Sequence, residues 1–375
     1  MNSEKLCLYA SEKSWIEGEA LRQLERVAQF AGMIRVAGFP DLHPGKGSPV
    51  GAAMLTKDVF YPYLIGSDIG CGMGLFATEL SASKGKPEKW SRIVGGLDEP
   101  WNGDVRSWLE EHNARPEGFA DALGTIGHGN HFAELLRVHE IRDSEKFSRL
   151  PLDKSRLILL VHSGSRGLGE SILRSHVNRF KDGGLYVGSD DADAYLSRHN
   201  NALAWAKANR ELIAYRLLAQ LKSDYKPLID LIHNSITPIS DGTEHLFLHR
   251  KGAAPSDSGP VIVPGSRGAL SYLVMPTGDQ KANLWSIAHG AGRKWGRAEC
   301  ERRLRERFSA DSLRRTKMGN YVICDDKNLL YEEAPQAYKD IDVVIDQMVS
   351  FGLISVIASF SPVLTYKVRQ LSSRS

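Results

Sequence analysis

The chain has 375 residues, of which 42% are hydrophobic and 25% are charged, and its formal net charge is +3. This composition is ordinary for a soluble globular protein, and the mild basic excess permits an anionic partner without demonstrating one. The four cysteines are scattered and form no CxxC pair, which excludes a disulfide framework and a zinc finger and favours the reducing cytoplasm.

The sequence contains no segment typical of a membrane protein. Its start, MNSEKLCLYASEK, lacks the basic-then-apolar pattern of a signal peptide. The longest apolar run, residues 348–364, is interrupted by Gly352, several serines and Pro362, so it predicts a buried strand rather than a bilayer span. We therefore expect no contact with a membrane.

The spacing of apolar residues predicts the order of the elements. Residues 14–33 have apolar positions at helical spacing, with Ser14 and Glu17 as a capping box. Residues 39–53 contain three prolines and predict a loop. Further along we expect short helices around Trp90, Trp101 and Trp108, a strand at 156–161 followed by a helix, a helix at 192–221, strands at 245–250, 260–265 and 270–275, a helix at 332–348 and a final strand. The chain has no linker or internal repeat, which favours one continuous domain.

Asp68 and Cys71 stand three positions apart in the glycine-rich stretch YPYLIGSDIGCGMG, residues 61–74. Glycines allow tight backbone geometry, and a carboxylate beside a thiolate suits a borderline metal ion. The structural alternative is a turn whose aspartate caps a backbone amide and whose cysteine packs as a small hydrophobic residue. Taken alone the stretch favours this alternative, so the choice depends on the rest of the chain.

Other ligand-type side chains also sit on turns at the ends of apolar segments. They are His131, with Asn130 and Glu134 beside it, and then His162, His233 and His289. Each histidine alone is more often a structural residue. Together with the aspartate and the cysteine, however, the set suits Mn, Fe, Co or Zn, and a thiolate can bridge two metals.

Cationic residues are placed on similar turns: Lys46, Arg166, Arg250, Lys251, Arg293 and Arg297. Arg166 follows a strand and a glycine turn before a predicted helix, which is a favourable place for phosphate oxygens. The residues therefore indicate a metal-dependent enzyme that acts on a phosphate-bearing substrate. They do not separate hydrolysis from ligation.

Seven motifs resemble, in this order, those of the RtcB family of RNA ligases: DLHPGKG, YPYLIGSDIGCGMG, GTIGHGNHFAEL, VHSGSRGLG, HRKGAAP, VPGSRGALSY and AHGAGR. The resemblance implies an α+β fold of the RtcB type, a single domain over residues 1–375 with mixed sheets around a metal-lined central cleft, flanked by helices. It also implies GTP- and manganese-dependent joining of an RNA 3′-phosphate or 2′,3′-cyclic phosphate end to a 5′-hydroxyl. The implied intermediates are a guanylylated histidine and RNA-3′-pp-guanosine.

The resemblance implies a role for individual residues as well. His289 would be the guanylylated nucleophile, and Cys71 would be shared by two manganese ions. The other manganese ligands would be Asp68, His131, His162 and His233. The GTP-binding residues would be Asn130, Glu134, Ser266, Ser271, His289, Tyr338 and Lys367. RNA or phosphate oxygens would be bound by Lys46, Arg166, Arg250 and Arg293.

Three positions depart from the family pattern. His128 stands where Gly is usual, Arg267 stands where Met is usual, and the C-terminal TYKVRQ differs after Lys367. The short chain resembles the compact bacterial branch that is associated with a peptide-release-factor homologue, which implies repair of translation RNAs. Two alternatives stay open: an RNA 3′-end-processing enzyme that does not seal, and a non-catalytic RNA-binding partner of a translation factor.

Overall fold

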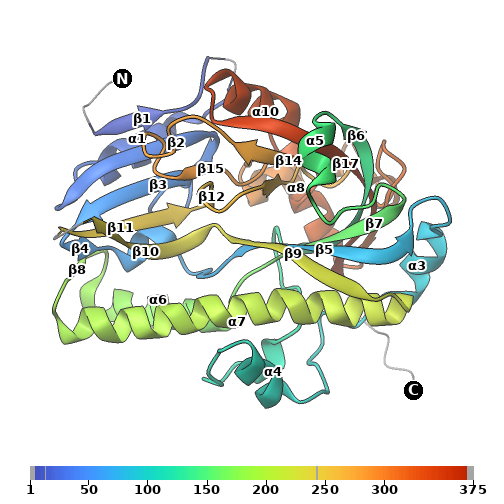
Figure 1. The fold of residues 1–375 in the computed structure, drawn as a ribbon, viewed down its shortest axis with the longest axis horizontal. Helices are drawn as coiled ribbons and strands as arrows, with labels where there is room; N and C mark the ends of the chain where they lie inside the picture. The colour runs from blue at the N-terminus through green and yellow to red at the C-terminus, as the bar shows by residue number, and fades with distance from the viewer. Residues whose placement is uncertain (1–4, 13, 242–243, 370–375) are drawn as a thin grey trace.

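Two β-sheets form the frame of the protein, with helices packed against them (Figure 1). The computed structural model describes residues 5–12, 14–241 and 244–369. The first sheet has five strands in the order β1 (Leu6–Leu8), β2 (Met33–His43), β3 (Val50–Lys57), β11 (Glu244–Lys251) and β10 (Asn234–Asp241). The second has the order β13 (Val261–Val263), β14 (Ser271–Pro276), β17 (Ile354–Val368), β6 (Phe132–Ile141), β7 (Arg156–Ser163), β5 (Gly72–Ser81) and β9 (Tyr225–Ile232), with β16 (Tyr321–Cys324) paired to β17.

Strand direction is mixed in both sheets. The pairs β1–β2 and β16–β17 are parallel, whereas the other pairs of these two sheets are antiparallel. Two further antiparallel pairs join β4 (Val59–Phe60) to β8 (Leu185–Tyr186) and β12 (Ala253–Pro255) to β15 (Ser286–Ala288). The predicted α+β class with mixed sheets and flanking helices is therefore confirmed.

The described residues form ten α-helices and three short 3₁₀ helices. The α-helices are α1 (Gly18–Val27), α2 (Pro62–Ile65), α3 (Pro87–Ile93), α4 (Val105–Glu111), α5 (Ser144–Ser148), α6 (Gly167–Phe180), α7 (Asp190–Leu221), α8 (Arg297–Arg305), α9 (Lys327–Glu332) and α10 (Ile341–Ser350). The 3₁₀ helices are Ala120–Ala122, Asp311–Leu313 and Pro335–Ala337. No helix in the described part of the chain combines the length and apolarity that crossing a bilayer requires.

The long helix α7 lies along one side of the molecule, beneath β10 and β9 in Figure 1, and α4 lies on its far side. Its start is well specified, because the Ser189 side chain accepts a hydrogen bond from the Ala192 amide and three aspartates fill the first turn. Trp205 and Leu212 are buried between this helix and its neighbours. The prediction of a helix at 192–221 is confirmed.

The N-terminal helix is shorter than its apolar spacing predicted. It begins at Gly18 and ends at Val27, and Glu17 makes no capping hydrogen bond through its side chain. Ser14 instead donates its hydroxyl to Gln347, so the capping box was wrong. The chain then enters β2 at Met33, because this segment pairs with β1 and β3.

Other local predictions need smaller corrections. The proline-rich residues 39–53 are not only a loop, since β2 runs to His43 and β3 begins at Val50. Helices α3 and α4 contain Trp90 and Trp108, but Trp101 lies outside any helix. The helix expected at 332–348 starts only at Ile341, after a 3₁₀ turn at Pro335 and the capping residue Asp340. The strands at 156–161, 245–250 and 270–275 are confirmed, and residues 260–265 contain β13.

Residues 295–338 form a small unit, the C-terminal satellite, with an apolar cluster of its own. This cluster includes Cys300, Leu304, Leu313, Val322 and Leu329, all buried. The satellite contains α8, α9 and β16, and β16 joins it to the large sheet through parallel pairing with β17. The last described residues lie beside it, and Gln370 of the TYKVRQ motif lies outside the described residues.

Arg210 on α7 ties the helix to the large sheet. Its side chain is fully buried, and its Nε and Nη2 atoms donate to Asp230 on β9 at 2.7 and 2.6 Å. Its Nη1 atom donates to the carbonyls of Gly70 and Ser163 at 2.7 and 2.9 Å. One guanidinium therefore satisfies a carboxylate and two backbone groups from separate segments.

We expect Arg210→Met to destabilise the protein by about 3–5 kcal/mol, because Asp230 and two carbonyls lose their donor inside the fold. Urea unfolding followed by circular dichroism measures this change. The matched control is Arg210→Met/Asp230→Asn, which removes the unpaired charge and should recover part of the loss. A single variant that unfolds within about 1 kcal/mol of wild type would contradict the assignment.

Candidate active site

Four neighbouring strands of the large sheet bring the predicted donors to one edge. Asp68 and Cys71 lie just before β5, His131 just before β6, and His162 near the end of β7. His233 follows the end of β9. Because β6, β7, β5 and β9 are antiparallel neighbours, the starts of β6 and β5 meet the ends of β7 and β9.

The donor atoms of these residues are close together. The Cys71 sulfur lies 3.4 Å from His131 Nε2 and 3.2 Å from His162 Nε2. His162 Nε2 is 3.3 Å from His233 Nε2, and His131 Nε2 is 2.8 Å from Asp68 Oδ2. The atoms form two sets of three, Asp68–Cys71–His131 and Cys71–His162–His233, which share the thiol. Either set could hold a metal ion.

Hydrogen bonds outside the cluster orient two of the imidazoles. His131 Nδ1 lies 3.1 Å from the Ile126 carbonyl, and His162 Nδ1 lies 3.1 Å from the Asn130 carbonyl. A carbonyl only accepts, so each Nδ1 carries a hydrogen, and Nε2 of the neutral His162 presents a lone pair to the cluster. Nε2 of His131 instead donates to Asp68 Oδ2, and a bound metal ion would replace that hydrogen. This arrangement is typical of histidines that bind a metal through Nε2.

Burial controls the protonation of the cluster. It lowers the pKa of His162 and of His233 well below the usual value, which keeps both imidazoles neutral. Burial also raises the pKa of the Cys71 thiol, and the carboxylate of Asp68 raises it further. For Asp68, burial is outweighed by the charge and hydrogen bond of His131, so its pKa falls to about 2. A divalent cation would stabilise the thiolate and use the neutral imidazole lone pairs, so the donor set fits a metal.

His289 lies next to this cluster, with its ring centroid 4.7 Å from that of His233. Its Nδ1 atom is 2.6 Å from Asp41 Oδ2, and its backbone amide donates to the same oxygen at 3.1 Å. Asp41 is fully buried on β2, and Lys339 holds the flanking carbonyls of Pro40 and Leu42. The carboxylate therefore fixes the ring and leaves Nε2 with its lone pair free.

Asp41 was missed by the sequence analysis although it lies inside the DLHPGKG motif. The only signal was an acidic residue between two prolines in a motif from which only Lys46 was assigned a role. Its partner lies 248 positions away in the chain, a separation that local spacing does not reveal.

Residues from distant segments surround Glu333, which the sequence analysis also missed. Arg293 Nη1 donates to its Oε1 at 3.0 Å, and the Tyr338 hydroxyl donates to its Oε2. Lys367 Nζ lies 3.8 Å from Oε2 and donates to the Gly129 carbonyl at 2.9 Å. Burial acts to raise the pKa of Glu333, but Lys367 and Arg293 outweigh it and lower the pKa. We call this group the Glu333 cluster.

The other residues assigned to GTP binding are spread around the Glu333 cluster and the metal donors. Glu134 is buried on β6 and accepts a hydrogen bond from the Thr365 hydroxyl. Burial raises its pKa to about 7, against the opposing effects of Thr365 and Lys367. Ser271 is the buried first residue of β14, and Ser266 lies in the turn before it. The carbonyl of Asn130 is the acceptor for His162 described above.

The four residues assigned to RNA or phosphate differ in their surroundings. Lys46 is exposed. Arg166 precedes α6, and its buried Nε atom has no hydrogen-bond partner in the part of the chain that the structure describes. Arg250 is buried and donates to the Ser286 hydroxyl and the Trp285 carbonyl. Arg293 donates from all three nitrogens within the protein, to Trp295, Glu333 and Glu332 among others. Arg250 and Arg293 are therefore engaged in internal contacts.

The two unusual residues inside the motifs have opposite surroundings. His128 is exposed. Arg267 is buried in the turn before β14, where its Nη2 donates to the Leu330 carbonyl at 2.5 Å. Its Nε and Nη1 atoms are buried without a hydrogen-bond partner among the described residues, close to the Glu333 cluster.

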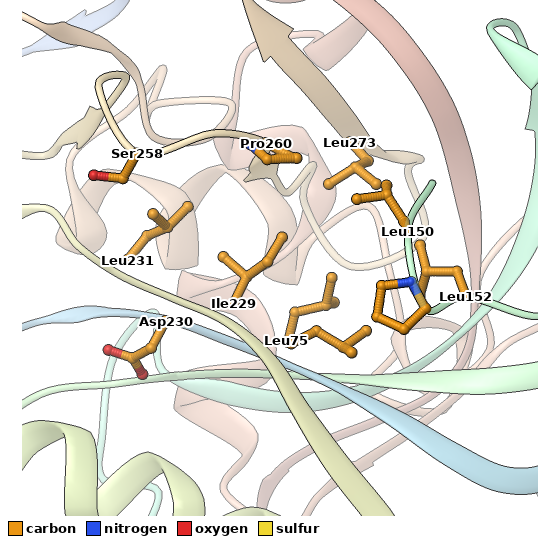
Figure 2. A pocket seen from close by; sticks show the side chains of 11 residues that line it. Leu75, Leu150, Leu152, Ile229, Asp230, Leu231, Ser258, Pro260 and Leu273 are labelled. Carbon is orange, nitrogen blue, oxygen red and sulfur yellow. The ribbon is translucent and has the colours of Figure 1, made fainter. Parts of the chain in front are cut away.

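A separate cavity of about 260 Å³ lies on the large sheet. It is lined by aliphatic residues of β5, β9 and β14 and of the turns at 150–152 and 258–260, and Figure 2 shows the Asp230 side chain pointing away from the leucines. None of the residues assigned above to metal, GTP or RNA lines it. With no group of convergent polar side chains, it is not the site of the chemistry.

Comparison with known proteins identifies the family to which the chain belongs. A family model described as tRNA-splicing ligase RtcB matches residues 23–114 and 101–368. The chain is 48% identical to RNA-splicing ligase RtcB2 of Escherichia coli, with 97% of this chain and 96% of the relative covered. It is 29% identical to tRNA-splicing ligase RtcB of Nanoarchaeum equitans, with 96% and 94% covered. The chain therefore belongs to the RtcB family of RNA ligases.

Substitution of single donors tests the two sets separately. We expect Cys71→Ser to weaken Mn²⁺ binding at both sites, because the thiol is the shared donor. Asp68→Ala and His233→Ala should each weaken one site, by about 100-fold or more. Isothermal titration calorimetry with Mn²⁺ measures affinity and number of sites, and the exposed His245→Ala is the control. Equal Mn²⁺ binding by wild type and Cys71→Ser would contradict the assignment.

Proposed function

We propose that the protein is a GTP- and Mn²⁺-dependent RNA ligase that joins 3′-phosphate or 2′,3′-cyclic phosphate ends to 5′-hydroxyl ends. The observation that carries this proposal is the pair of donor sets sharing Cys71 beside the oriented imidazole of His289. Bound metal ions would neutralise the triphosphate and polarise the phosphorus that is attacked.

In the proposed reaction, His289 Nε2 attacks the α-phosphorus of GTP and pyrophosphate leaves. The GMP group then passes to an oxygen of the RNA 3′-phosphate, which frees His289 and forms RNA-3′-pp-guanosine. The 5′-hydroxyl loses its proton as it attacks the RNA phosphorus, and GMP leaves. A 2′,3′-cyclic end first takes up one water to become the 3′-phosphate.

Asp41 has a positioning role in this reaction. Its Oδ2 atom accepts from both the ring and the backbone of His289, so the imidazole keeps its hydrogen on Nδ1 and its lone pair on Nε2. Its buried negative charge also stabilises the ring when the phosphorus–nitrogen bond gives the imidazole a positive charge.

The guanine base would lie at the Glu333 cluster, with Glu134, Ser266, Ser271, Tyr338 and Lys367 around it and Asn130 toward the phosphates. Lys46 and Arg166 would hold RNA or triphosphate oxygens. Arg166 is the better placed, because its guanidinium lies close enough to Asp68 for their charges to interact. We leave Arg250 and Arg293 out of this set because internal acceptors already engage them.

The proposal includes a cytoplasmic setting and repair of cleaved translation RNAs, functionally coupled to a release-factor homologue. The four cysteines are free thiols, which fits a reducing compartment. Product analysis on RNA that carries both a 3′-phosphate and a 5′-hydroxyl separates sealing from end processing alone.

Transfer of label from [α-³²P]GTP in the presence of Mn²⁺ tests the nucleophile. Wild type should form a covalent GMP adduct on a denaturing gel, His289→Ala should form none, and His245→Ala should match wild type. Asp41→Asn should slow adduct formation by about 10- to 100-fold, because the ring loses its anionic orienting partner. A metal-loaded wild type that forms no adduct would overturn the proposed function.

GTP binding should depend on pH through Glu134, whose pKa is about 7. Only the ionised carboxylate accepts from both N–H groups of the guanine edge, so protonation below pH 7 should weaken binding by about tenfold per pH unit. Above pH 7 the affinity should be constant. Titrations in the His289→Ala background avoid the covalent step, and Glu134→Gln should remove this dependence. The same pH profile in both proteins would contradict the role of Glu134.

A further inference from the structure

A strongly basic segment starts one residue before the C-terminal satellite and otherwise lies within it, and the site described above does not use this segment. Residues 294–317 contain nine lysines and arginines against four acidic residues, a net charge of +5. The whole chain carries +3, so the remaining residues together carry −2. The positive charge of the protein is therefore concentrated in one short segment.

Four cations of this segment are exposed and make no ion pair with any residue that the structure describes: Arg302, Arg307, Arg315 and Lys317. Arg315 donates to the Tyr321 hydroxyl at 2.7 Å, whereas Arg302 and Arg307, at and just beyond α8, and Lys317, in the turn before β16, are left for a partner. Neighbouring arginines are paired instead: Arg303 with Glu299, and Arg305 with Glu301. The acidic residues of α8 thus neutralise other arginines and leave Arg302 free for a partner.

Aromatic rings hold several of these arginines against the satellite. The guanidinium of Arg303 lies 4.9 Å from the ring centroid of Trp295, and that of Arg305 lies 5.1 Å from the ring of Tyr331. Arg315 lies 4.7 Å from the ring of Tyr321. Since the buried cluster beneath them anchors α8 and β16, the basic surface has a defined shape.

The basic segment begins at the active site. Arg297, the first residue of α8, has its Nε atom 3.5 Å from Glu333 Oε1. A Cβ atom on Gly129 would lie 2.9 Å from Arg297 Nη2, so this side chain packs against the turn that holds Asn130 and His131. The positive surface therefore runs outward from the Glu333 cluster and the Gly129 turn along α8.

We propose that residues 294–317 bind the single-stranded RNA that flanks the reacting end. The inference rests on the proposed function and adds to it the surface along which the RNA approaches. A triphosphate at the buried donors would not reach the exposed cations of the satellite. An RNA strand would reach them, because its phosphates continue beyond the reacting end. Each phosphate that contacts a lysine or arginine of the protein releases its bound counterions.

The test compares Arg302→Gln/Arg307→Gln/Lys317→Gln with a control, Lys154→Gln/Lys207→Gln/Lys226→Gln. The control removes the same charge from exposed lysines outside the satellite that make no ion pair with a described residue. Fluorescence anisotropy with a short RNA bearing a 3′-phosphate measures affinity over a series of salt concentrations. GMP-adduct formation without RNA is measured in parallel.

We expect the satellite variant to bind RNA about 10- to 100-fold more weakly, with a log–log salt slope smaller by about 2, from about 0.7 per lost phosphate contact. The control should keep the wild-type affinity and slope, and all three proteins should form the GMP adduct equally. Equal RNA binding by the two variants would overturn the inference. Loss of the adduct in wild type would instead overturn the proposed function, so the two failures are distinguishable.

Discussion

The candidate active site depends on burying a cysteine thiol that would act as an anion if it bound a metal ion. Cys71 is only 3% exposed, and both burial and the Asp68 carboxylate oppose loss of its proton. The histidines beside it do not help, because burial keeps His162 and His233 neutral. Arg210 supplies a fixed positive charge behind the turn, but its guanidinium is already paired with Asp230. A bound cation would supply the positive charge that a thiolate at this position needs.

Because the donors are buried and must be held close together, they come from the edge of a sheet and not from one long loop. The register pairs Met73 with His162 and Phe132 with the same histidine, so three segments are fixed relative to one another by backbone hydrogen bonds. A shift of one residue would turn His162 to the opposite face of the sheet. Glycines at positions 66, 70 and 72 let the aspartate and the cysteine turn into the cluster, and a Cβ on Gly72 would lie 2.3 Å from the Leu231 carbonyl.

Features that depend on local chemistry could be predicted from the sequence, and those that depend on distant partners could not. Glycine turns at the ends of apolar segments predicted the donors, and the structure brings all five metal-type residues together. The same reasoning assigned Arg250 and Arg293 to phosphate, which stays a prediction; in the structure Arg250 donates to Ser286 and Trp285, and Arg293 donates to Glu333. Asp41 and Glu333 were missed because their partners lie far away in the sequence. The first helix was drawn too long because its apolar spacing continues into residues that pair as β2.

The metal donors and the Glu333 cluster lie at two ends of the candidate site and suit ligand groups of opposite charge. In the proposed function this difference sets the direction in which a ligand lies. At the metal end, buried anionic donors need cations. At the Glu333 cluster, by contrast, Arg293, Lys367 and the nearby Arg267 surround one ionised carboxylate, and two Arg267 donors have no acceptor. Guanine presents acceptor atoms that suit such donors, and its triphosphate suits metal ions. In the proposed function GTP would therefore lie in one direction, with the base at the satellite and the α-phosphorus beside His289. The exposed cations of the satellite would then lie beyond the bound nucleotide, on the side from which we propose that the RNA approaches.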